Sequence, residues 1–283
     1  MDSLKTPQKK RKKKLSNDLD ITYEKVKRDL PNYRTASELM TKEVAIITPE
    51  ASLQEAAKIM GERHIGSLIV MKYRTPLGIV NERDLLSKII VPGLFLKDEK
   101  VENNMSYPLP SVSVAAKIKE AARMMITFKS SRLGVFDGGN LAGIITASDL
   151  VKSLPDVAES KVRVDDYMSK AVVLADEEMH INAIADMLGR NRIGSVIIAR
   201  EGEPYGIFTE RDLIANFLAV GRKMFTEVGP ECSSPLITIP AGNSVHKAAV
   251  LIALKHIRRL PVVADGVVVG MITARDLIGA YAK

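Results

Sequence analysis

The side chains with the clearest chemical potential in this 283-residue sequence are aspartates that recur at a nearly fixed interval. Each ends the pattern Gly-x-x-(Thr/Asn)-x-x-Asp, and successive copies lie 65, 63 and 64 residues apart. The aspartates are Asp84, Asp149, Asp212 and Asp276. The residues three positions earlier are Asn81, Thr146, Thr209 and Thr273. Four copies at such an interval indicate one structural unit used four times.

Two interpretations of this pattern use the same atoms. In the first, the threonine caps a helix and the aspartate reaches back to the cap in a capping box, where an acid also suits the helix dipole. In the second, the helix N-terminus receives an anion and the carboxylate accepts two hydrogen bonds from a ribose diol. The preceding glycine would then let a ligand approach the backbone closely. The constant glycine and spacing favour the second interpretation, because capping alone requires neither.

A second landmark predicts the elements that hold these aspartates. An apolar helix face with spacing i, i+3, i+4, i+7 starts 31 residues before each aspartate. The four faces start at Leu53, Ile118, Ile181 and Val245. β-Branched runs separated by turns follow each face and precede the motif, which indicates two strands. Each copy therefore has the order β-α-β-β-α, an α/β (α+β) fold, and the expected repeats span 34–95, 99–157, 161–222 and 226–283.

The repeats are expected to associate in pairs. A three-stranded sheet with two helices is too small to bury its own core well, so one face of each sheet needs cover. We predict that repeat one pairs with repeat two and repeat three with repeat four. Met40, Met105 and Met168 mark equivalent positions ahead of the first three repeats, whereas repeat four lacks this methionine.

The positive charge of the chain is concentrated ahead of the first repeat. The net charge is +7, and every residue from Lys9 to Lys14 is basic. Residues 1–19 have almost no apolar content, so residues 1–33 are predicted to be a basic disordered tail with a short helix at 20–30. The tail either anchors nucleic acid by releasing counterions or is a solvated, solubilising segment.

Other totals disfavour several classes of protein. The single cysteine, Cys232, excludes an intrachain disulfide framework and a cysteine zinc site. No apolar run approaches the roughly 20 residues that a membrane span needs, and the four histidines show no metal-ligand spacing. Because the repeats use almost the whole chain, an enzyme is also disfavoured. We therefore expect a cytoplasmic protein that does not act on a membrane and has no catalytic cofactor.

The motif Gly-hydrophobic-hydrophobic-Thr-x-x-Asp-Leu, repeated four times over residues 34–283, resembles the signature of the cystathionine β-synthase (CBS) domain. The resemblance implies two Bateman modules of paired repeats, an arrangement similar to γ subunits of AMP-activated protein kinase. It also implies non-catalytic regulation, with AMP, ADP, ATP or S-adenosylmethionine bound between partners. A homodimer through the modules and an effector protein are further implied. The alternative is a nucleic-acid-associated protein that uses the basic tail, with the repeats as scaffold or sensor.

The resemblance assigns expected roles to individual residues. The four motif aspartates become ribose-diol acceptors, and Asn81 is a departure from the family threonine. A phosphate-facing pair before the second strand corresponds to His64-Ile65, Ser131-Arg132, Arg192-Ile193 and Arg258-Arg259. Thr48 matches a position that lines the base or phosphate. Since only repeat four has two basic residues in its pair, we expect tighter binding in the second module.

The arginines next to the motif aspartates allow two interpretations. Arg83, Arg211 and Arg275 each precede an aspartate by one residue. They either reach a phosphate or remain exposed in the first helical turn without a role.

Overall fold

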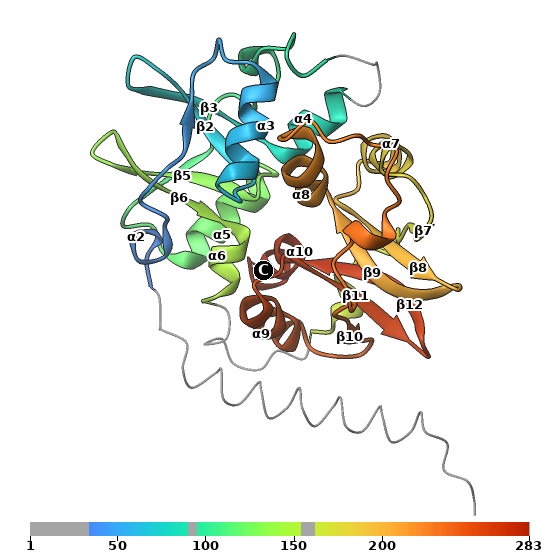
Figure 1. Cartoon of the computed structure of the whole chain (residues 1–283). Helices are drawn as coiled ribbons and strands as arrows, with labels where there is room; N and C mark the ends of the chain where they lie inside the picture. Colours follow the sequence, from blue (N-terminus) through green and yellow to red (C-terminus); the bar gives the residue numbers. More distant parts are fainter. Residues whose placement is uncertain (1–33, 90–94, 154–161, 283) are drawn as a thin grey trace, which may run out of the picture.

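The computed structural model describes residues 34–89, 95–153 and 162–282. The expected tail, the expected helix at 20–30 and most of the predicted boundary between the two halves lie outside the described residues. The described chain forms four three-stranded sheets, and each sheet belongs to one repeat. In Figure 1 the sheets of repeats one and two lie on one side, those of repeats three and four on the other, with helices between them.

All four repeats have the predicted order β-α-β-β-α. Repeat one contains α2 (Ala36–Leu39), β1 (Ile46–Ile47), α3 (Leu53–Glu62), β2 (Ser67–Lys72), β3 (Thr75–Asn81) and α4 (Glu82–Ile89). Repeat two contains η1 (Val101–Asn103), β4 (Ser111–Ser113), α5 (Ile118–Thr127), β5 (Arg132–Asp137), β6 (Asn140–Thr146) and α6 (Ala147–Val151). In each sheet the first strand runs parallel to the second and the third is antiparallel to it.

The second half repeats this order with one change in its helices. Repeat three contains η3 (Val164–Asp166), β7 (Leu174–Asp176), α7 (Ile181–Asn191), β8 (Ser195–Arg200), β9 (Glu203–Thr209), α8 (Glu210–Leu213) and a π-helical turn, η4 (Ile214–Leu218). Repeat four contains η5 (Gly229–Glu231), β10 (Ile239–Pro240), α9 (Val245–Lys255), β11 (Arg259–Ala264), β12 (Val267–Thr273) and α10 (Ala274–Ala282). The predicted fold class is therefore confirmed.

The pairing of repeats depends on an exchange of the stretch before each first strand, here called the leading segment (34–45, 95–110, 162–173 and 222–238). Thr41 and Ile144 exchange backbone hydrogen bonds of 2.9 and 3.0 Å, so the leading segment of repeat one extends the sheet of repeat two. The other three exchanges join Ile79 with Ser106, Ser169 with Met271, and Ile207 with Ser233. Each leading segment thus completes its partner's sheet, which pairs repeat one with two and three with four.

The motif glycines make room for this exchange. A Cβ atom on Gly143 would lie 2.7 Å from Met40 Sδ and 2.8 Å from the carbonyl oxygen of Thr41. Met105 and Met168 contact the motif glycines of repeats one and four in the same way. The glycine therefore admits the partner's leading segment, whereas the sequence interpretation reserved that space for a ligand.

Cys232 takes the place of the methionine that repeat four lacks. A Cβ atom on Gly206 would lie 2.5 Å from Cys232 Sγ, and the thiol donates to the Gly229 carbonyl oxygen at 3.2 Å. Burial raises the pKa of this thiol. A smaller sulfur-containing side chain thus fills the equivalent position, so Cys232 belongs to the packing between repeats three and four.

The apolar cores join repeats across the two halves of the chain. One core combines repeats one and three, where α3 packs against η4, and Gly61 faces Ala215 and Ala219. The other core combines repeats two and four, where α10 packs against α5 and α6. Pairing within a module therefore explains only part of the burial that was expected from it. Exchange of leading segments links the partner repeats, and helix packing between the two modules buries the remaining apolar surface.

Within the described ranges, each helix is too short or too polar to cross a bilayer.

Replacing a motif glycine by alanine should weaken the exchange between repeats. We expect Gly143→Ala to lower the free energy of unfolding by about 2 kcal/mol, because a new Cβ would overlap Met40 and a fixed backbone oxygen. Gly279→Ala is the matched control, since its Cβ would meet only Ile126 Cδ1 at 3.7 Å. That helical change should stabilise by up to about 1 kcal/mol. Equal effects in urea unfolding would contradict the packing role of Gly143.

Candidate functional site

All four motif aspartates cap the helix that follows the third strand of their repeat. Asp212 Oδ2 accepts from the Thr209 N–H and from the Thr209 hydroxyl, both at 2.8 Å, and the Asp212 N–H donates to Thr209 Oγ1 at 3.3 Å. Thr146 and Thr273 make the same three bonds with their aspartates. The capping interpretation is therefore confirmed at the level of hydrogen bonds.

Repeat one uses an amide in place of the threonine hydroxyl. Asn81 Oδ1 accepts from the backbone of Asp84 at 3.4 Å and of Arg83 at 3.0 Å, while Asp84 Oδ2 accepts from the Asn81 N–H at 3.0 Å. The strand-to-helix turn is thus kept in repeat one despite the departure from threonine.

In Asp212 and Asp276 the helix cap uses one carboxylate oxygen, and the other oxygen remains available to a ligand. In the described part of the chain, the side-chain hydrogen bonds of Asp212 and Asp276 all reach Oδ2. In repeat two, by contrast, Lys152 Nζ lies 3.0 Å from Asp149 Oδ1. Capping and ligand binding are therefore compatible on Asp212 and Asp276, whereas both oxygens of Asp149 already have protein partners.

The carboxylate of Asp212 is held in a desolvated position. Burial raises its pKa, although the bonds from Thr209 and the charges of Arg259 and Arg211 act in the opposite direction. Arg211 precedes Asp212, whereas Arg259 comes from repeat four, so the aspartate lies at a boundary between partner repeats. A buried carboxylate that lacks full compensation gains from additional hydrogen-bond donors.

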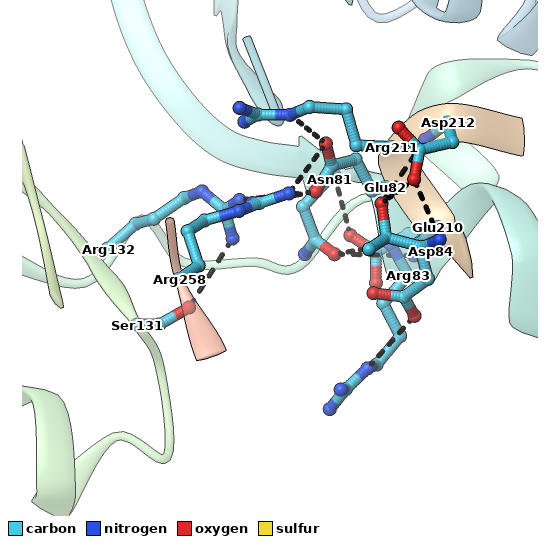
Figure 2. Close-up of polar contacts among 11 residues, drawn as sticks. Asn81, Glu82, Arg83, Asp84, Ser131, Arg132, Glu210, Arg211, Asp212 and Arg258 are labelled. Atoms are coloured by element: carbon cyan, nitrogen blue, oxygen red, sulfur yellow. Dashed lines mark hydrogen bonds and ion pairs between the residues drawn. The ribbon is translucent and has the colours of Figure 1, made fainter. Parts of the chain in front are cut away.

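A buried glutamate of repeat one, Glu82, lies close to arginines from each of the other three repeats. Glu82 is 5% exposed at its side chain and accepts from Arg211 Nε at 3.0 Å and from Arg258 Nη1 at 2.9 Å. Arg132 Nη2 lies 3.9 Å away. Figure 2 shows these three arginines approaching Glu82 from different parts of the chain. The charges of the arginines outweigh the opposing effect of burial and lower the pKa of Glu82 to about 2.

Glu210 is the equivalent residue of repeat three, and its environment differs. Its partner Arg83, 3.6 Å away, belongs to repeat one, so the two glutamates exchange arginines across the modules. Repeat two has Ser131 at the position that corresponds to Arg258 of repeat four. Glu210 therefore has fewer arginine contacts than Glu82 has. Burial raises the pKa of Glu210 despite Arg83 and Arg259. The two related carboxylates are therefore shifted in opposite directions.

Two arginines pack on glycines of their partner repeat. A Cβ atom on Gly66 would lie 2.7 Å from Arg132 Nη2, and one on Gly194 would lie 2.5 Å from Arg259 Nη1. Burial lowers the pKa of both guanidinium groups, that of Arg259 to about 10. Five arginines in total (Arg83, Arg132, Arg211, Arg258 and Arg259) surround the two buried glutamates of this junction.

Strand register corrects the predicted phosphate-facing pairs. Arg132 lies opposite Thr146, and Arg259 lies opposite Thr273. The residues in this position in repeats one and three are Ser67 and Ser195. The predicted equivalence of His64 with Ser131, and of Arg192 with Arg258, is therefore wrong by two residues. Both are exposed and have positive φ, as have Lys129 and His256 at the equivalent helix ends.

The remaining predicted positions have simpler surroundings. Thr48 is exposed just beyond the end of β1, and Arg275 is exposed in the first turn of α10. Arg83 and Arg211, whose sequence interpretation was open, contact glutamates of the opposite module. Sequence reasoning missed Glu82 and Glu210; the available signal was their presence in copies one and three alone, where copies two and four have alanine.

The sequence matches a known domain family over most of its length. The family model for the CBS domain matches residues 36–91, 99–156, 164–219 and 227–283. Uncharacterized protein MJ1225 of Methanocaldococcus jannaschii is 25% identical over 194 residues, which are 64% of this chain and 69% of that protein. An uncharacterized 33.4 kDa protein encoded in a ribosomal RNA operon of Thermofilum pendens is 27% identical over 194 residues, which are 64% of each protein.

Solved structures share the architecture. The crystal structure of MJ1225, a protein proposed as an archaeal homologue of g-AMPK, has a TM-score of 0.72 at 20% identity and covers 87% of this chain and 99% of its own. An uncharacterized conserved protein from Pyrococcus horikoshii has a TM-score of 0.60 at 21% identity and covers 88% and 99%. At these identities the similarity establishes the fold alone.

Removing the charge of Glu82 should destabilise the junction. We expect Glu82→Gln to lower the free energy of unfolding by about 3 kcal/mol at neutral pH, because buried guanidinium groups lose their counter-charge. Since the folded-state pKa is depressed from 4.5 to about 2, this stabilisation is present above pH 4.5 and disappears as the pH falls through about 2.

Urea unfolding of both proteins between pH 7 and pH 2 measures this difference. Glu50→Gln is the control, because Glu50 contacts Lys72 in an exposed ion pair and its loss should change stability far less. A Glu82→Gln penalty that stays constant down to pH 2 would show that the ionised carboxylate is not its source.

Proposed function

Because the chain belongs to the CBS domain family, we propose that it is a non-catalytic regulatory protein that senses adenosine nucleotides of the AMP, ADP and ATP class. The observation that carries this proposal is the combination of capped aspartates with an open Oδ1 and a junction rich in guanidinium groups. The aspartate suits a ribose diol, and the arginines suit phosphate. The γ-AMPK relationship proposed for MJ1225 is consistent with this assignment.

The geometry supports a ribose at the strand-to-helix turn with its phosphate directed toward the junction. Arg259 pairs in register with Thr273 at the turn of repeat four, and its charge also acts on Asp212 of repeat three. A ligand between partner repeats would thus meet a ribose acceptor and a phosphate donor together. The desolvation of Asp212 favours such a ligand, because diol donors would compensate the buried charge.

The charge of the junction distinguishes ligand classes. The guanidinium groups of the junction attract phosphate groups and repel the sulfonium cation of S-adenosylmethionine. We therefore propose AMP, ADP or ATP as the ligand, ahead of S-adenosylmethionine.

The two modules are proposed to differ in affinity. In repeat two the Lys152 ammonium group already contacts Asp149 Oδ1 and competes with a diol for that oxygen. Asp212 and Asp276 have no such competitor among the described residues. The second module, formed by repeats three and four, is therefore the tighter site.

Regulation requires a component that responds to the bound ligand. We propose an effector protein or a second copy of the chain for this role. The nucleic-acid hypothesis rests on residues 1–19, which lie outside the described residues, and is not proposed.

Replacing the motif aspartates by asparagine separates capping from ligand binding. Asparagine keeps one carbonyl oxygen for the cap but puts an amide donor where the open oxygen was. We expect Asp212→Asn and Asp276→Asn each to change unfolding stability by less than about 1 kcal/mol. Affinity for AMP should fall tenfold or more, since a charge-assisted bond contributes about 1.5–3 kcal/mol.

Isothermal titration calorimetry on ligand-free protein with AMP, ADP, ATP and S-adenosylmethionine measures these affinities. Asp186→Asn is the matched control, because Asp186 makes an exposed pair with Arg190 on α7. If both motif variants bound AMP as tightly as the unsubstituted chain, the aspartates would act only as helix caps and the proposed ribose contact would be wrong.

A further inference from the structure

We propose that Glu82 is an internal counter-anion that occupies the arginines of the junction and must be displaced when a ligand phosphate binds there. This inference rests on the proposed function and adds a residue that sets how strongly the site prefers a phosphorylated ligand. Glu82 acts through Arg211 and Arg258, whose donors it occupies.

The contacts of Glu82 are those that a phosphate would need. Oε2 accepts from Arg258 Nη1 at 2.9 Å, Oε1 accepts from Arg258 Nη2 at 3.3 Å, and Oε1 also accepts from Arg211 Nε at 3.0 Å. The Arg258 contact is bidentate, which is the geometry that guanidinium groups offer to carboxylates and phosphates alike. A phosphate that recruits the same Arg258 donors must therefore replace the carboxylate.

The counter-anion operates on one side of the junction. Position 258 is an arginine in repeat four, while the equivalent residue of repeat two is Ser131, which accepts from Arg132 Nη1 at 3.4 Å. Glu210 consequently has one ion pair, with Arg83 at 3.6 Å, and no bidentate contact among the described residues. Glu82 and Glu210 carry the same charge at related positions but differ in the donors that they occupy.

Displacement of Glu82 would also affect how the modules are joined. Glu82 belongs to the first module, whereas Arg211 and Arg258 belong to the second. A phosphate that takes these arginines removes two ion pairs between the modules. Ligand binding is thereby coupled to the contact between the halves of the molecule.

Three variants of the full chain separate occupation of the arginines from simple loss of charge. Glu82→Gln removes the charged acceptor, and Glu82→Asp keeps the charge but withdraws the carboxylate from its partners. Glu210→Gln is the matched control, because it removes the same charge near the same junction. Each variant is checked for a cooperative thermal transition and is then titrated calorimetrically with AMP, adenosine and inorganic pyrophosphate.

We expect Glu82→Gln and Glu82→Asp to raise the preference for AMP over adenosine at least tenfold relative to the unsubstituted chain, and to strengthen pyrophosphate binding. Glu210→Gln should raise the AMP preference less than threefold. Equal increases in Glu82→Gln and Glu210→Gln would overturn the proposal in favour of a long-range charge effect. An unchanged or reduced preference in Glu82→Asp would also overturn it, and this variant decides the matter if Glu82→Gln does not fold.

Failure of the proposed function gives a different result. If neither AMP nor adenosine binds to any of the chains, nucleotide sensing is wrong, but pyrophosphate still tests the junction. Tighter pyrophosphate binding in both Glu82 variants than in Glu210→Gln would support the counter-anion, and no difference among them would overturn it.

Discussion

The structure depends on one constraint: a single repeat cannot complete its own sheet or bury its own core. Backbone hydrogen bonds from the leading segments complete the sheets within each module, as at Thr41 and Ile144. Helix packing then buries apolar surface across the modules, between repeats one and three and between repeats two and four. The two kinds of contact alternate around the molecule, so each repeat is held by two others. The strand-to-helix turns of all four repeats are thereby brought toward one junction.

This junction concentrates charges that lie far apart in the sequence. Glu82 from repeat one meets Arg132, Arg211 and Arg258 from the other three repeats. The guanidinium groups outnumber the two glutamates, and burial of Arg132 and Arg259 makes their charge costly without a counter-ion. The fold therefore maintains a desolvated, positively charged centre beside the capped aspartates. Its related glutamates differ because Ser131 and Arg258 break the symmetry between the modules.

Features with a local cause were predictable from the sequence. The periodicity identified all four repeats, and the spacing of Thr209 and Asp212 indicated the capping box found at the end of β9. Features that depend on contacts between repeats could not be predicted from the sequence. The role of Cys232 follows from a leading segment packing on a partner's glycine, and the environment of Glu82 follows from the meeting of four repeats. Arg192 was misaligned because a pair of basic residues has no periodicity that fixes strand register.

The central claim is that Asp212 and Asp276 each serve two partners, the helix cap through Oδ2 and a ribose diol through Oδ1. A crystal structure of ligand-free protein soaked with AMP tests this claim most directly. The account predicts ribose hydroxyls on Oδ1 of Asp212 and Asp276 while Thr209 and Thr273 remain on Oδ2, with the phosphate on guanidinium groups of the junction. AMP bound away from these turns, or bound between repeats three and four without contact to either Oδ1, would contradict it.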